Sequence, residues 1–135
     1  MAKFLKTYEI LLKKATVDLN MAKIALDTFE KGDIELDLEV IMFHLQQSTE
    51  KLIKTLLDIN KIKFPHSHDL EKLYNLTKEN NIIIIDKVDK LLPLSDYAVE
   101  GRYAIIHDDI ENIYEYIKIL NDFKEFIKIE VENKK

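Results

Sequence analysis

The sequence predicts an all-α fold, an up-and-down antiparallel helical bundle of four to five helices with a short accessory helix. Long stretches of the chain place apolar residues three and four positions apart, which is the spacing of an amphipathic α-helix. The 135 residues include only 2 glycines and 2 prolines, too few for the many turns of a β-sandwich or barrel. Because 47% of the residues are hydrophobic and none is cysteine, we expect a packed core without disulfides in a single domain, residues 1–135.

Two long amphipathic helices are expected in the first half of the chain. The first covers residues 4–31 and stops at Gly32, and the second covers residues 34–60 with Asp33 as its N-cap. The turn between them would be very short, which predicts an antiparallel hairpin. The two apolar stripes consist of Phe4, Tyr8, Leu11, Ala15, Leu19, Ala22, Leu26 and Phe29, and of Ile34, Leu38, Ile41, Leu45, Ser48, Leu52, Leu56 and Ile59.

A loop and a short helix should follow. Pro65 excludes a helix over residues 61–67, and residues 68–80 have the spacing of a short helix. The four isoleucines at 82–85 have no partner strand, so we expect them to begin a helix or to form a buried linker.

Two further helices are expected before the end of the sequence. One covers residues 86–103 and should be kinked or divided at Pro93. The last begins at an N-cap, Asp108 or Asp109, and continues to about Val131. Some of its apolar residues lie outside the main stripe and could meet a partner: Ile119, Phe123, Phe126 and Ile129.

Charge and motif content exclude several classes of protein. The formal net charge of −5 argues against broad, non-specific binding to a nucleic acid duplex. The sequence shows no signal peptide, and its longest apolar run is too short to cross a membrane, so we expect a cytoplasmic protein without a membrane partner. Glycine-rich phosphate loops and di-iron carboxylate motifs are missing, so we expect no cofactor and no metal.

Arg102 is the only arginine among 20 basic residues, and His107 follows five positions later. An arginine fork can hold a phosphate and stabilise its growing charge, and a histidine can move the proton of a 2′-hydroxyl. On a straight helix the two residues would lie about 140° apart, so one phosphate could meet both only if the backbone bends or two copies meet. The alternative is a surface ion pair for Arg102 and an N-terminal helix position for His107.

A polar edge is expected on the second helix. Steps of three and four residues align His44, Gln47, Lys51 and Lys54. Residues 51–72 contain five lysines and three acidic residues, which makes this stretch locally basic. The alternative is a solvated helix face with pairs such as Glu50 and Lys54.

His66, Ser67, His68 and Asp69 form a short polar run before the third helix. Its histidines could bind metal or contact phosphate, but no third ligand lies nearby in sequence. The alternative is that His68 caps the helix that opens at Asp69.

Three of these segments together resemble the HEPN domain family. Residues 46–54, QQSTEKLIK, are similar to the family's Q-Q-x-x-E-K-x-x-K helix. His68-Asp69-Leu70 is similar to its H-D-L turn, and Arg102-Tyr103 to its R-Y motif. The resemblance covers roughly residues 5–130.

The resemblance implies a homodimer whose interface brings two copies of Arg102 and His107 into one cleft. It implies a metal-independent endoribonuclease, the toxin of a pair whose partner is a small nucleotidyltransferase acting as antitoxin. One alternative is a non-catalytic subunit that binds a nucleotide or the substrate of that nucleotidyltransferase, and another is a helical adaptor with no nucleic-acid role. In the ribonuclease, the resemblance implies that Arg102 and His107 are the catalytic residues. The substrate, RNA or a nucleotide, is expected to be contacted by Tyr103, Gln47, Lys51, Lys54 and His68.

Overall fold

A computed structural model describes residues 5–98 and 110–134 of the chain. These residues form five helices: α1 (Thr7–Lys31), α2 (Leu38–Ile59), α3 (Leu70–Glu79), the 3₁₀-helix η1 (Val88–Tyr97) and α4 (Ile110–Lys134). No strand occurs within these ranges. The prediction of an all-α fold is therefore confirmed.

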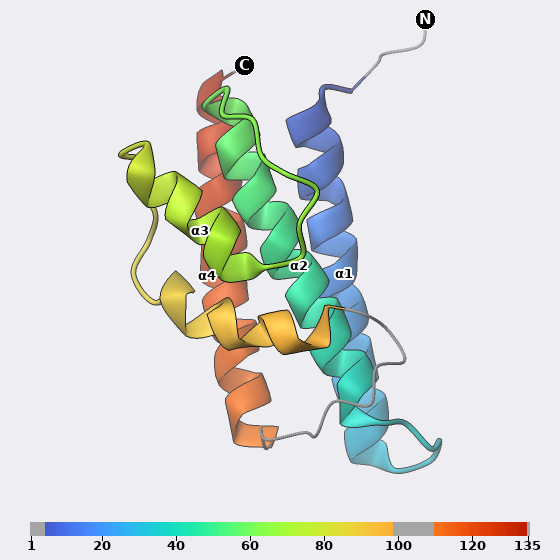
Figure 1. Cartoon of the computed structure of the whole chain (residues 1–135). Helices are drawn as coiled ribbons and strands as arrows, with labels where there is room; N and C mark the ends of the chain where they lie inside the picture. The colour runs from blue at the N-terminus through green and yellow to red at the C-terminus, as the bar shows by residue number, and fades with distance from the viewer. Residues whose placement is uncertain (1–4, 99–109, 135) are drawn as a thin grey trace, which may run out of the picture.

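Three long helices form the body of the molecule, and two short helices cross one side of it (Figure 1). α1 runs antiparallel to α2 and α4, so α2 and α4 point in the same direction (Figure 1). α3 packs on α2, and η1 packs on α2, α3 and α4. α2 therefore lies at the centre and contacts every other helix.

The central position of α2 explains why polar residues on it are buried. Ser48 and Thr55 are completely buried, and each hydroxyl donates to a backbone carbonyl. Ser48 Oγ donates to the carbonyl of Ala15 on α1 over 2.8 Å, which joins the two helices where they pack. A buried polar group needs such a partner, because an unpaired one would destabilise the fold.

The connection between α1 and α2 is longer than the sequence predicts. Gly32 ends α1 with a φ of 71°, a left-handed conformation that glycine adopts easily, as predicted. The N-cap prediction for Asp33 is wrong, because α2 begins at Leu38 after Asp37. Ile34 is 65% exposed and contributes nothing to the core, so no packing extends the helix back to it.

The region predicted as a kinked fourth helix is a 3₁₀-helix. Val88, Leu91, Leu94 and Tyr97 are all buried and are spaced by three residues, which aligns them on one face of a 3₁₀-helix. In an α-helix the ring of Pro93 would clash with the carbonyl of Asp89, four residues earlier, which also disfavours the α-helical form. The last residues of the predicted helix, 99–103, lie outside the described residues.

Two other segments differ in detail from their predictions. The isoleucines at 82–85 form neither a helix nor a buried linker, because Ile83 is 82% exposed and the other three are only half-buried. The predicted caps Asp108 and Asp109 lie outside the described residues. Most of the second apolar surface of α4 packs within the chain: Ile119 and Phe123 are buried, Phe126 is half-buried, and only Ile129 is exposed.

The short helix α3 is capped by Asp69, not by His68. The Asp69 carboxylate accepts from the backbone N–H groups of Glu71 at 3.0 Å and Lys72 at 3.4 Å. The Ser95 hydroxyl of η1 accepts from the backbone N–H of Leu70 at 2.9 Å. These bonds fix the start of α3 against η1.

Asp69→Ala is expected to lower the free energy of unfolding by about 1 kcal/mol, because two N–H groups lose their acceptor. Urea unfolding followed by circular dichroism measures this difference. Asp69→Asn, which keeps a capping oxygen, should recover most of the loss. Equal destabilisation by both variants would contradict the capping role.

Candidate functional site

A buried carboxylate, Glu50, organises the polar residues where α2 meets the start of α3. Its side chain is only 5% exposed. Oε1 accepts from Gln46 Nε2 over 3.1 Å and lies 2.9 Å from His68 Nδ1, while Oε2 accepts from Lys54 Nζ over 2.9 Å. Gln47 joins by donating to Gln46 Oε1 over 2.6 Å. We call these residues, Gln46, Gln47, Glu50, Lys54 and His68, the Glu50 cluster.

The Glu50 cluster keeps its carboxylate ionised although it is buried. Burial is the largest single effect and raises the pKa of Glu50, but the hydrogen bonds from Lys54, His68 and Gln46 together outweigh it. The net pKa therefore lies below the ordinary value of 4.5. The folded state thus favours the charged carboxylate.

This lowered pKa predicts acid sensitivity. A carboxyl group with a lower pKa in the folded chain stabilises the fold above its unfolded pKa, and this contribution disappears as the pH falls through its folded pKa. The free energy of unfolding should therefore decrease below pH 4.5, the ordinary value for Glu50. Glu50→Gln, which cannot ionise, should show a smaller decrease over the same range. Parallel pH profiles for parent and variant would contradict the assignment.

A second buried carboxylate joins α1 to α2. Asp18 is 13% exposed at its side chain, and its Oδ1 lies 3.1 Å from His44 Nδ1. Its Oδ2 accepts a hydrogen bond from Lys51 Nζ. Lys51 and His44 therefore hold α1 against α2.

The structure divides the predicted polar edge between these two carboxylates. His44 and Lys51 contact Asp18, whereas Lys54, Gln47 and His68 belong to the Glu50 cluster. The predicted pair of Glu50 and Lys54 is confirmed, but these side chains are 5% and 12% exposed, so this is not a solvated helix face. Lys54 Nζ also lies 5.8 Å from the centre of the Phe64 ring, which covers it.

Sequence analysis missed the central position of Asp18 and Gln46. Asp18 lies within the apolar stripe of α1, beside Ala15, Leu19 and Ala22, and all four are buried. A charged residue at a core position of a helix indicates a buried partner. This pattern could have identified the contact between α1 and α2.

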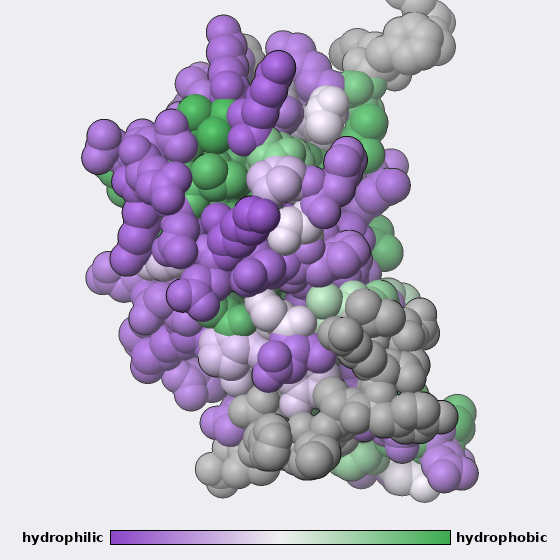
Figure 2. All heavy atoms as spheres, viewed as in Figure 1, coloured by the Kyte–Doolittle hydropathy of each residue, from purple (hydrophilic) through white to green (hydrophobic). Residues whose placement is uncertain are grey.

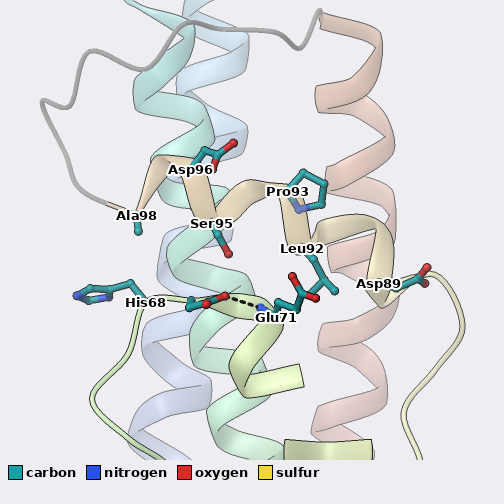
Figure 3. A pocket seen from close by; sticks show the side chains of 9 residues that line it. His68, Glu71, Asp89, Leu92, Pro93, Ser95, Asp96 and Ala98 are labelled. Carbon is teal, nitrogen blue, oxygen red and sulfur yellow. Dashed lines mark hydrogen bonds between the residues drawn. The ribbon is translucent and has the colours of Figure 1, made fainter. Parts of the chain in front are cut away.

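A hollow of about 750 Å³ lies between the start of α3 and η1 (Figure 3). Leu92, Pro93 and Ser95 line it from η1 and Ala98 from just after it, together with His68 and four carboxylates, those of Asp69, Glu71, Asp89 and Asp96. These negative side chains make the hollow unsuitable for an RNA phosphate. Within the described ranges, no three His, Asp or Glu side chains are arranged to hold a metal ion.

The three remaining predicted residues, Arg102, Tyr103 and His107, lie outside the described residues. They fall in the connection between Tyr97, where η1 ends, and Ile110, where α4 begins.

None of the helices in the described ranges is both long enough and apolar enough to span a bilayer.

Two short helices cross a body of three long helices, so the fold is that of a small all-α domain. Its Q-Q-x-x-E-K-x-x-K segment is joined to an H-D-L turn. The family model of the HEPN domain matches residues 8–134, which is nearly the whole chain. The chain therefore belongs to the HEPN domain family. Comparisons with curated proteins and with solved structures gave no match.

Proposed function

We propose that this HEPN domain is a metal-independent endoribonuclease with Arg102 and His107 as its catalytic residues. The main support is the family match over residues 8–134, a range that includes the only arginine and a histidine five positions after it. Arg102 holds the scissile phosphate with two parallel hydrogen bonds and stabilises its developing charge. His107 removes the proton of the attacking 2′-hydroxyl or protonates the leaving oxygen.

Catalysis requires both side chains to meet one phosphate. Their positions differ by about 140° on a straight helix, so we propose that a homodimer supplies them from two chains. Light scattering at micromolar concentration should give the mass of a dimer. A monomer at that concentration would contradict this arrangement.

The Glu50 cluster holds the side chains of Gln47, Lys54 and His68 in place. This supports their proposed role as substrate contacts. Lys54 and His68 share the buried carboxylate of Glu50, and Gln47 is held through Gln46. Lys51 is similarly held by an ion pair with Asp18. His68 is 61% exposed at its side chain, and its ring points away from the carboxylates of the acidic hollow (Figure 3), so of the predicted substrate contacts on the described residues it is the most accessible to RNA.

The biological role that we propose is that of a cytoplasmic toxin restrained by a small nucleotidyltransferase. This proposal rests on the family alone. It predicts that co-expression with such a partner relieves growth inhibition by the parent but has no effect on an inactive Arg102→Ala variant.

The chemistry can be tested on a defined RNA oligonucleotide in EDTA. Attack by a 2′-hydroxyl leaves a 2′,3′-cyclic phosphate, which mass spectrometry of the products identifies. Replacing the nucleotide before the cut site with its 2′-deoxy form should block cleavage there. Cleavage of the deoxy substrate at the same site would contradict the proposed role of His107.

The second candidate is a non-catalytic subunit that binds a nucleotide or the substrate of the nucleotidyltransferase. Tyr103 favours it, because active HEPN ribonucleases usually carry a small polar residue directly after the arginine. It predicts saturable nucleotide binding without RNA cleavage. Binding should weaken in Lys51→Ala or Lys54→Ala, and a flat titration with the parent would exclude it.

A further inference from the structure

The outer face of α1 carries an apolar stripe that nothing in the described chain covers. Ile10, Val17, Met21 and Ile24 are 40%, 53%, 42% and 59% exposed. Their spacing of seven, four and three residues places them within a band about 60° wide and about 21 Å long. The opposite side of α1 is buried against α2 and α4, so this stripe is not part of the core.

A hollow of about 430 Å³ lies at the N-terminal end of this stripe. Leu5, Ile10 and Val17 form its apolar lining, and Lys13 and Lys14 stand beside them. Part of this surface shows as hydrophobic spheres at the edge of the molecule where α1 begins, on a face that is otherwise mostly hydrophilic (Figure 2).

The charges around the stripe are basic, although the chain as a whole is acidic. Lys13 and Lys14 are exposed, and neither forms an ion pair within the described ranges. The one carboxylate in the hollow, Asp18, is already bonded to Lys51 and His44. An apolar stripe with unpaired lysines beside it is complementary to an apolar surface that carries acidic residues.

We propose that the outer face of α1 binds an amphipathic helix of another protein that has acidic residues beside its apolar face. A helix presents apolar side chains at three- and four-residue spacing, and one of them fills the hollow lined by Leu5, Ile10 and Val17. The glutamates or aspartates of the partner pair with Lys13 and Lys14. This inference uses neither Arg102 nor His107, so it stands or fails independently of RNA cleavage.

Three other occupants fit the surface less well. A second copy docked through the same face would place Lys13 and Lys14 of both chains in one interface. A lipid bilayer has no protruding side chain that could fill the hollow. Single-stranded RNA binds on aromatic side chains, and the lining of the hollow contains none.

A designed peptide probe tests this proposal with the full chain. The probe is a fluorescent amphipathic helix with leucines on one face and glutamates beside them, and the comparison peptide carries lysines in place of the glutamates. Fluorescence anisotropy should show saturable binding of the glutamate peptide, at least about tenfold tighter than that of the lysine peptide. The doubly substituted variant Lys13→Glu, Lys14→Glu should reverse this preference.

Ile24→Asp and Ile129→Asp form a matched pair, because their side chains are 59% and 60% exposed on different helices. Ile24→Asp should weaken binding of the glutamate peptide at least about tenfold, and Ile129→Asp should leave it unchanged. Circular dichroism confirms that both variants fold. The proposal is overturned by absent binding, by equal binding of the two peptides, or by equal effects of the two variants. It is also overturned if the glutamate peptide does not bind and Ile24→Asp abolishes self-association of the chain or its binding to phosphatidylserine vesicles.

Discussion

Arg102→Lys is expected to lower the rate of RNA cleavage at least about 100-fold, although it keeps the positive charge. The reason is geometric. A guanidinium donates two parallel hydrogen bonds to a phosphate, whereas an ammonium acts as a point charge and cannot reproduce this contact. Single-turnover kinetics on a labelled RNA oligonucleotide measure the change.

Lys118→Ala provides the control for this prediction, because Lys118 is an exposed cation on α4. It should cleave RNA at the parental rate. If Arg102→Lys retains full activity, the arginine contributes only charge, and its proposed role as a phosphate fork is wrong. If Arg102→Ala also retains full activity, Arg102 is not catalytic.

Glu50→Ala is expected to lower the free energy of unfolding by about 3 kcal/mol. The substitution leaves the ammonium of Lys54, only 12% exposed, without its ion pair. It also removes one of the two acceptors of Gln46 and frees the His68 ring, so the segment before α3 keeps only the bond from Gln46 to the His68 carbonyl as its link to this part of α2. Urea unfolding measures the difference between parent and variant.

Glu125→Ala is the matched control, because Glu125 also has two basic partners but is 61% exposed. Its oxygen lies 3.9 Å from the amines of both Lys124 and Lys128. Water screens these pairs, so the loss should be below about 1 kcal/mol. Equal losses for Glu50→Ala and Glu125→Ala would show that the Glu50 cluster does not stabilise the fold.

Much of the fold could be predicted because helical spacing records which side of each helix is buried. The stripes of α1 and α2, the stop at Gly32 and the short helix after Pro65 all follow from local pattern. The 3₁₀-helix η1 was missed because its signal, Val88, Leu91, Leu94 and Tyr97 at strict three-residue spacing, is also compatible with an α-helix. The parallel direction of α2 and α4 depends on how α3 and η1 cross the bundle, which no local pattern specifies (Figure 1).

The candidate site was less predictable than the fold. Helical spacing correctly aligned Lys51 and Lys54 on α2, but it could not show that each faces a different buried carboxylate. Those contacts depend on the packing of α1 and of the segment around His68 against α2. Partner choice for a charged side chain is a property of tertiary structure, so sequence spacing leaves it open.

The most direct test of the proposed activity is cleavage of mixed RNA by the purified chain in the presence of EDTA. The parent and the double variant Arg102→Ala, His107→Ala are incubated side by side, and the products are separated on a denaturing gel. The account predicts that the parent cleaves RNA without divalent metal and that the double variant does not. Cleavage by both proteins would contradict the assigned residues, and cleavage by neither would contradict the nuclease and favour the nucleotide-binding subunit.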